Sequence, residues 1–239
     1  MWNGFKSEEF KFENRDAIIV FPDSENDASK LALKTEYWGA FPDIEINLLK
    51  NGFHLAFIKN QTRFATKEDC DIKARFVKFL ADKYNLSQKC VPIGMSCGGA
   101  HAIRFAGFYP ELVSCIYIDA PVLNFASFPG KIGNASQEEV WENEFVNAYP
   151  GIKRYKLLGF REHPINMADT IIAHKIPVIM VYGTEDDVVL YEENGMLLEE
   201  AFAATGLLKT IRVNCRGHHP HGKIGDNSEI VNFIIEHSN

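Results

Sequence analysis

The chain has 239 residues, of which 46% are hydrophobic and 24% are charged, and its formal net charge at pH 7 is -7. This composition is typical of a globular α/β domain with a sizeable core. Nucleic-acid and anionic-membrane binding both depend on basic patches, and the sequence has no Lys/Arg cluster, so neither partner is expected. The five cysteines are odd in number and widely spaced, and they predict neither a disulfide framework nor a zinc site.

Short apolar runs alternate with amphipathic helical patterns along the chain. Strands are expected at 17–21, 53–58, 90–93, 113–118, 177–182 and 210–213. Helices are expected at 42–49, 67–85, from Ser96 to about Tyr109, at 192–204 and at 229–237. Because helices separate the strands, we predict right-handed βαβ units and a mostly parallel sheet with helices on both faces. The alternating stretch Phe10-Lys11-Phe12 is typical of an exposed antiparallel edge hairpin.

Residues 122–174 interrupt this alternation because they hold no convincing strand. The segment is rich in aromatic residues and turn formers, among them Phe125, Trp141 and Tyr155. We predict one domain, residues 1–239, that carries a mostly helical insertion at about 122–174. Because this insertion follows the carboxyl end of a strand, we interpret it as a cap over the functional site; an additional helical layer is the alternative.

The first residues lack the apolar segment of a signal peptide, and no apolar stretch is long enough to cross a bilayer. We therefore expect a cytoplasmic protein without a membrane partner. A secreted form whose signal peptide has been removed would have the same sequence.

The most informative segment is Gly94-Met95-Ser96-Cys97-Gly98, which lies between a predicted strand and a predicted helix. In a G-x-S-x-G turn of this kind, the strained serine backbone projects the hydroxyl out of the sheet. The small residues on either side of the serine let the strand and the helix approach each other. Ser96 is therefore the candidate nucleophile. The alternative is that Ser96 only caps the helix that follows.

A serine nucleophile needs a base within hydrogen-bond reach, and that base needs an orienting carboxylate. On this architecture the acid and then the histidine should follow later strands. The candidate acids at strand ends are Asp119, Glu185, Asp186 and Asp187. The candidate bases are His218, His219 and His221. Three clustered histidines are also a candidate metal site, although no cysteine or second carboxylate lies at ligand spacing.

Three motifs, each after a predicted strand, together resemble the α/β-hydrolase superfamily. They are the segment 94–98, Gly183-Thr184-Glu185-Asp186 and Gly217-His218, which look like its nucleophile, acid and histidine motifs. The resemblance covers nearly the whole chain and implies the α/β-hydrolase fold, with Ser96 as nucleophile, Asp186 as acid and His218 as base. Asp187 and Asp119 are the alternative acids, and His219 is the alternative base. The segments 117–122, 127–130 and 217–221 resemble a poorly characterised bacterial subgroup whose members are often described as esterases or lipases.

The resemblance also implies two backbone N–H groups that stabilise an oxyanion. Cys97 is the expected first donor. Many superfamily members have His-Gly after an early strand, whereas this chain has Phe21-Pro22-Asp23-Ser24 there. Pro22 has no N–H, so Asp23, or alternatively Ser24, would be the second donor. The candidate substrate-binding residues are Asp119, at a strand end, and Trp141, in the aromatic insertion.

These residues predict a serine hydrolase that cleaves a carboxylic ester through an acyl-enzyme intermediate. The expected partner is a small-molecule ester with an apolar or ring-containing group, and no cofactor or metal is expected. A thioesterase, a lactonase or a peptidase would use the same triad. A non-catalytic binding protein of the same fold is the alternative from another class, but the presence of all three triad residues favours catalysis.

Overall fold

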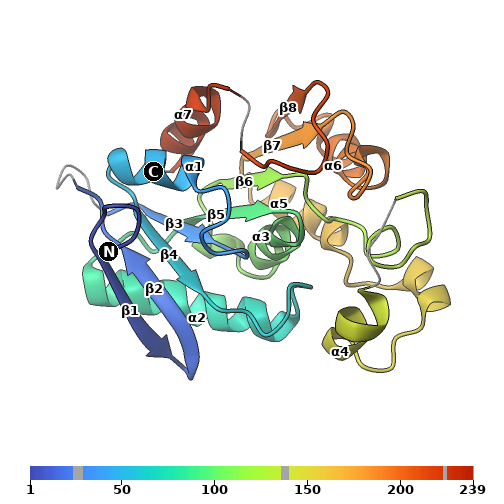
Figure 1. Cartoon of the computed structure of the whole chain (residues 1–239), viewed down its shortest axis with the longest axis horizontal. Coiled ribbons are helices and arrows are strands. Elements are labelled where there is room, and N and C mark those ends of the chain that lie inside the picture. Colours follow the sequence, from blue (N-terminus) through green and yellow to red (C-terminus); the bar gives the residue numbers. More distant parts are fainter. Residues whose placement is uncertain (24–28, 136–139, 223–224, 239) are drawn as a thin grey trace.

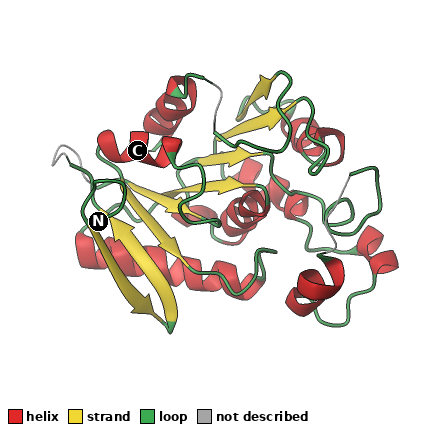
Figure 2. Ribbon diagram, viewed as in Figure 1, coloured by secondary structure: helices red, strands yellow, loops and turns green. Residues whose placement is uncertain are grey.

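The computed structural model describes residues 1–23, 29–135, 140–222 and 225–238. Within these ranges an eight-stranded sheet has the strand order β1-β2-β4-β3-β5-β6-β7-β8 (Figures 1 and 2). The strands are β1 (Ser7–Phe12), β2 (Arg15–Val20), β3 (Leu31–Lys34), β4 (His54–Ile58), β5 (Cys90–Met95), β6 (Ile116–Asp119), β7 (Val178–Gly183) and β8 (Leu208–Val213). The strands from β4 across to β8 are parallel, whereas β1 and β2 form an antiparallel hairpin at one edge. The predicted mostly parallel sheet and its antiparallel edge are therefore confirmed.

Helices cover both faces of the sheet, as predicted. On one face lie α1 (Asp43–Lys50) and α7 (Ser228–His237), which Figure 1 shows above the strands. On the other face lie α2 (Lys67–Tyr84), α3 (Cys97–Phe108), α5 (Ala168–Ala173) and α6 (Gly195–Phe202). Alternate residues of a strand point to opposite faces. In β5, for example, Cys90 packs in the core beneath α2 and α3, whereas Val91 and Ile93 pack in the core beneath α1 and α7.

β3 is not among the strands that the sequence predicts. Its four residues, Leu-Ala-Leu-Lys, are good helix formers and include no β-branched or aromatic side chain. Pairing decides their conformation, because β3 is buried between β4 and β5 and runs parallel to both. The chain order reverses here, since β4 lies on one side of β3 and β5 on the other. In open α/β sheets, ligands bind at the carboxyl ends of strands that flank such a reversal.

Segment 122–174 holds no strand in its described part, and its regular structure is short. It contains a π-helical turn at Trp141–Phe145, α4 (Val146–Ala148), 3₁₀ turns at Arg154–Gly159 and Pro164–Met167, and α5. Most of its aromatic side chains form an apolar cluster with Phe64 and Cys97, whereas Tyr155 is exposed. Figure 1 shows α4 beyond the carboxyl ends of the central strands. The interpretation of the segment as a cap, within a single domain, stays a prediction.

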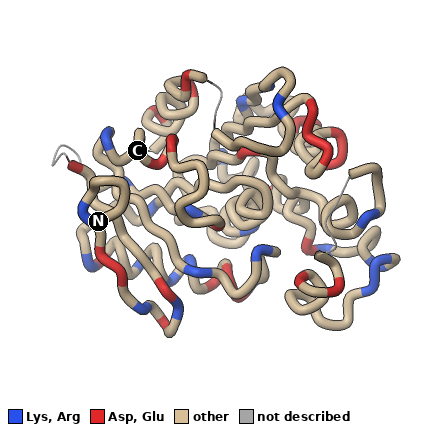
Figure 3. Tube along the Cα trace, viewed as in Figure 1, with Lys and Arg blue, Asp and Glu red and all other residues tan. Residues whose placement is uncertain are grey.

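Charged residues of both signs are distributed along the trace (Figure 3). Acidic residues are concentrated between the end of β7 and the start of α6, at Glu185, Asp186, Asp187, Glu192 and Glu193. In the described ranges, no helix combines the length and the apolar character that crossing a bilayer demands. The expected absence of nucleic-acid and membrane partners stays a prediction.

Candidate active site

Ser96 lies in the sharp turn between β5 and α3, with a φ of 54° and a ψ of -124°. This positive φ strains any residue other than glycine, so the surrounding structure must hold it. The Ser96 N–H donates to the Asp119 carbonyl at 2.9 Å, and the Ser96 carbonyl accepts from the Val122 N–H at 3.0 Å. Gly94 is needed because a Cβ there would lie 2.1 Å from the Gly98 carbonyl oxygen. The predicted strand-to-helix turn is confirmed.

The structure brings Ser96, His218 and Asp186 together from three separate strand ends. His218 Nε2 lies 3.0 Å from Ser96 Oγ, and His218 Nδ1 lies 2.8 Å from Asp186 Oδ2. A carboxylate only accepts hydrogen bonds, so the His218 proton belongs on Nδ1. The lone pair of Nε2 then faces the Ser96 hydroxyl, which is the arrangement that a general base requires.

The loop after β7 places one of three adjacent acidic residues against His218. Asp186 is buried, and its Oδ1 accepts the backbone N–H groups of Val188 at 3.0 Å and Val189 at 2.9 Å. Glu185 and Asp187 are exposed. These backbone bonds fix one oxygen of Asp186 and turn the other toward His218. Neither of the flanking acids takes this position.

The predicted substrate-binding role of Asp119 is wrong, because protein groups fill its hydrogen-bonding sites. Asp119 is fully buried and accepts from Arg216 Nη1 at 3.0 Å, Arg216 Nη2 at 2.6 Å and the Gly222 N–H at 2.9 Å. His221 Nδ1 lies 3.2 Å from the same carboxylate. Burial opposes ionisation of Asp119, but the bonds from His221 and Arg216 outweigh it and lower the pKa of the carboxyl. Asp119 therefore anchors the loop that carries His218.

The three histidines after β8 occupy different positions. Each offers a ring nitrogen within 4.8 Å of the others. His218 faces Ser96 and His221 is bonded to Asp119, whereas His219 is exposed and stacks on Phe41 with ring centroids 5.8 Å apart. His218 Nε2 cannot accept the Ser96 proton and bind a metal ion at once, so these two uses exclude each other.

The prediction that Asp23 donates an oxyanion N–H is wrong. β2 runs antiparallel to β4, so β2 ends where β4 begins: Val20 pairs with Leu55, and the Phe21 and His54 rings lie 5.4 Å apart. Asp23 therefore lies at the amino edge of the parallel strands, whereas Ser96 lies at their carboxyl edge. The alternative donor, Ser24, lies outside the described residues.

The loop after β3, residues 35–37, takes the place expected for the loop after β2. Thr35 Oγ1 lies 2.7 Å from the Gly98 carbonyl oxygen, and a Cβ on Gly98 would lie 3.3 Å from Glu36 Cβ. This close approach sets the loop against the first turn of α3. The N–H of Cys97, the first residue of that helix, has no acceptor within the helix, and its role as the first oxyanion donor stays a prediction.

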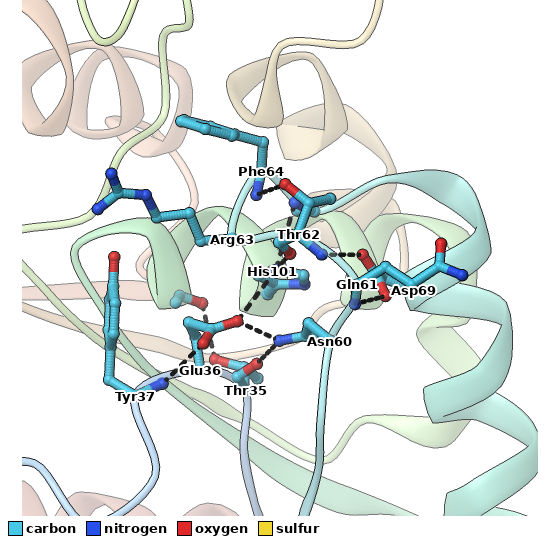
Figure 4. Close-up of polar contacts among 12 residues, drawn as sticks. Thr35, Glu36, Tyr37, Asn60, Gln61, Thr62, Arg63, Phe64, Asp69 and His101 are labelled. Carbon is cyan, nitrogen blue, oxygen red and sulfur yellow. Dashed lines mark hydrogen bonds and ion pairs between the residues drawn. The ribbon is translucent and has the colours of Figure 1, made fainter. Parts of the chain in front are cut away.

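A partly buried polar network holds this loop in place (Figure 4). The Glu36 carboxylate accepts from the Tyr37 N–H at 3.2 Å and from the Asn60 side-chain amide, and it lies 3.8 Å from His101 Nε2. Lys73 Nζ lies 3.1 Å from His101 Nδ1. Burial, reinforced by the Lys73 charge, holds the pKa of His101 well below its ordinary value. A neutral His101 can therefore accept on one ring nitrogen and donate on the other.

Tyr37 and Arg63 are functional candidates that the sequence does not reveal. Burial, reinforced by the neighbouring Cys97, raises the pKa of the Tyr37 phenol, so its hydroxyl stays protonated and able to donate. In Figure 4 this hydroxyl points to the side where the Arg63 guanidinium lies. Arg63 donates from Nε and Nη2 to Glu144 in segment 122–174, each bond 2.6 Å long. No local pattern marks Tyr37, because its role depends on the unpredicted strand β3.

A cavity of about 640 Å³ lies over Ser96. Its apolar wall consists of Ala40, Phe41, Met95, Phe128 and Val188, and its polar wall includes Tyr37, Arg63, His218, His219 and His221. Phe128 comes from segment 122–174. Trp141, which we expected to bind substrate, is not among the described residues that line this cavity. Trp141 is buried, stacks on Phe145 with centroids 5.0 Å apart and lies beneath Arg154, so that prediction is wrong.

The similarity of this chain to known proteins is found in the fold and not in the sequence. No protein-family model and no curated protein matches the sequence. Among solved structures, an acylaminoacyl peptidase from Pyrococcus horikoshii is similar with a TM-score of 0.75 and 13% identity, over 98% of this chain and 42% of that chain. Dipeptidyl peptidase 4 from Porphyromonas gingivalis is similar with a TM-score of 0.70 and 14% identity, over 99% and 36%. An esterase from Pyrococcus furiosus is similar with a TM-score of 0.68 and 19% identity, over 98% and 91%.

These similarities, with the strand order and the Ser96 turn, show that the chain has the α/β-hydrolase fold. The chain spans less than half the length of either peptidase but nearly the whole esterase. One fold supports many activities, so the activity has to be argued from the site.

Proposed function

We propose that the protein is a serine hydrolase that cleaves a carboxylic ester through an acyl-enzyme intermediate. The observation that carries this proposal is the line of hydrogen bonds from Ser96 Oγ through His218 to Asp186, with lengths of 3.0 and 2.8 Å. Asp186 orients the ring and stabilises the imidazolium that forms when Nε2 takes the serine proton. An intact line of this kind argues against a non-catalytic binding protein of the same fold.

In the first step, Ser96 Oγ bonds to the ester carbonyl carbon while its proton moves to His218 Nε2. The oxyanion that forms lies at the start of α3, where the Cys97 N–H donates and the helix dipole favours negative charge. We assign the second donor to the hydroxyl of Tyr37, which lines the cavity over Ser96 and interacts with the Cys97 side chain. The bond to the alcohol oxygen then breaks, and His218 gives its proton to that oxygen.

In the second step, water loses a proton to His218 Nε2 and bonds to the acyl carbon. The bond between this carbon and Ser96 Oγ breaks, Oγ regains the proton, and the carboxylic acid leaves. The apolar residues around Ser96, such as Met95 and Phe128, suit a short acyl chain.

Two observations support an ester rather than a peptide as substrate. The similar esterase matches this chain over 91% of its own length, whereas the similar peptidases extend far beyond the matched part. The cavity over Ser96 is also mainly apolar. Assays with a p-nitrophenyl ester, a matched thioester, a lactone and a p-nitroanilide separate the four activities that one triad can support. We expect the oxygen ester to have the highest kcat/KM.

Hydrolysis of p-nitrophenyl acetate tests the mechanism. We expect Ser96→Ala to lower kcat by at least about a thousandfold, because triad members act as a unit. Ser7→Ala, on the edge strand β1, is the control and should keep the wild-type rate. A fluorophosphonate should label the wild type and the control but not Ser96→Ala. Undiminished hydrolysis by Ser96→Ala would overturn the proposal, and so would activity that EDTA removes and a divalent metal restores.

A further inference from the structure

His221 forms a second aspartate–histidine pair in the wall of the cavity over Ser96. Its Nδ1 lies 3.2 Å from Asp119 Oδ1, and its ring is only 2% exposed. Its Nε2 is buried and has no hydrogen-bond partner among the residues that the structure describes. Asp119 is fully buried on the Nδ1 side of the ring, and His221 itself lines the cavity over Ser96.

The chemical state of this nitrogen follows from its neighbours. Asp119 forms a bidentate ion pair with Arg216, so it is a carboxylate and can only accept hydrogen bonds. The His221 proton in this bond therefore lies on Nδ1, a tautomer that leaves a lone pair on Nε2. A buried acceptor without a donor costs free energy, and a ligand that brings a donor recovers it.

We propose that His221 Nε2 accepts a hydrogen bond from a substrate hydroxyl on the carbon adjacent to the one that bears the ester oxygen. This inference rests on the proposed function. His218 must hand its proton to the leaving alcohol oxygen, so that oxygen lies against the His218 ring. The His221 ring is the next one, with its centroid 4.9 Å from that of His218. A hydroxyl one carbon further along the alcohol reaches it, which makes the substrate a monoester of a diol or polyol.

Two small esters test the inference. 2-Hydroxyethyl acetate and propyl acetate have the same number of non-hydrogen atoms, but only the first has a terminal donor on its alcohol. We expect wild-type kcat/KM to favour 2-hydroxyethyl acetate by about tenfold beyond the ratio in uncatalysed hydrolysis. All assays contain EDTA, which keeps metal ions from bridging the histidines.

Two variants of His221 distinguish the roles of its two ring nitrogens. His221→Asn keeps an amide donor where Nδ1 stands, so the bond to Asp119 survives and only Nε2 is lost. We expect its preference for 2-hydroxyethyl acetate over propyl acetate to fall to the uncatalysed ratio. His221→Gln places an amide near the Nε2 position and should retain part of the preference, although it lacks the bond to Asp119.

Three outcomes would overturn the inference. The same preference in His221→Asn and the wild type would show that Nε2 does not meet the hydroxyl. An equal loss on both esters would show that His221 only supports its loop. Wild-type cleavage of p-nitrophenyl acetate but of neither alkyl ester would reject this substrate class while leaving the proposed function standing. A different result, hydrolysis that does not depend on Ser96, would overturn the proposed function.

Discussion

Arg216 and Asp119 form a buried ion pair that joins the loop carrying His218 to the end of β6. The two bonds, Nη1 to Oδ2 and Nη2 to Oδ1, are 3.0 and 2.6 Å long. The backbone carbonyl of Asp119 also accepts the Ser96 N–H at 2.9 Å. One residue therefore positions both the turn of the nucleophile and the loop of the base. Its carboxylate is not free to bind substrate, because Arg216, His221 and the Gly222 N–H occupy it.

We expect Asp119→Ala to lower the free energy of unfolding by about 3 kcal/mol, because it leaves the Arg216 charge buried without a partner. Urea unfolding followed by circular dichroism measures this change. The control is Glu200→Ala, an exposed position in α6, which should stay within about 0.5 kcal/mol of the wild type. An unchanged urea midpoint for Asp119→Ala would contradict the anchoring role.

Tyr37→Phe should lower kcat by about a hundredfold with little change in KM, because it removes a hydrogen bond that forms only with the oxyanion. Asp23→Ala is the matched control. Its side chain and N–H lie at the opposite edge of the sheet, so we expect wild-type kinetics from it. Steady-state hydrolysis of p-nitrophenyl acetate measures both variants. A wild-type kcat for Tyr37→Phe would remove the hydroxyl from the oxyanion site.

Much of the candidate site can be predicted from the sequence because its residues follow recognisable strands. Ser96 lies between glycines that a sharp turn requires, and Asp186 and His218 come after the strands β7 and β8. Strand order along the chain then implies which loops share an edge of the sheet. Local residue types and the parallel topology are sufficient for this part of the argument.

The remaining errors have one physical origin, which is that local sequence does not show a residue's partners. Leu31–Lys34 becomes a strand only because β4 and β5 flank it, so the loop with Tyr37 could not be identified. From the sequence Asp119 is indistinguishable from a free carboxylate, because its partner Arg216 lies far along the chain. The sequence likewise does not show that neighbouring residues of its own segment bury Trp141.

The buried His101 makes stability depend on pH. Burial, and then the Lys73 charge, hold its pKa in the folded protein well below the ordinary value of about 6.5. As the pH falls through about 6.5, the unfolded chain takes up a proton at His101 and the folded protein does not. The stability contributed by a neutral His101 is therefore fully present above that pH and decreases below it.

Urea unfolding between about pH 7.5 and about pH 5.5 measures this loss. His101→Gln cannot take up a proton, so it should be less stable at neutral pH but lose less stability on acidification than the wild type. Because the other histidines are common to both proteins, the difference between the two slopes reports His101 alone. Equal slopes would show that His101 is protonated in the folded state as readily as in the unfolded chain.

Phe128 and Trp141 both belong to the aromatic cluster of segment 122–174, but they should affect the enzyme differently. Phe128 lines the cavity over Ser96, so Phe128→Ala enlarges it. We expect kcat/KM for p-nitrophenyl butyrate, relative to the acetate, to rise roughly fivefold. Trp141→Ala should instead lower the free energy of unfolding by about 3 kcal/mol and leave that ratio unchanged, because Trp141 fills the interior of the segment. An equal shift in acyl preference from both variants would contradict this division.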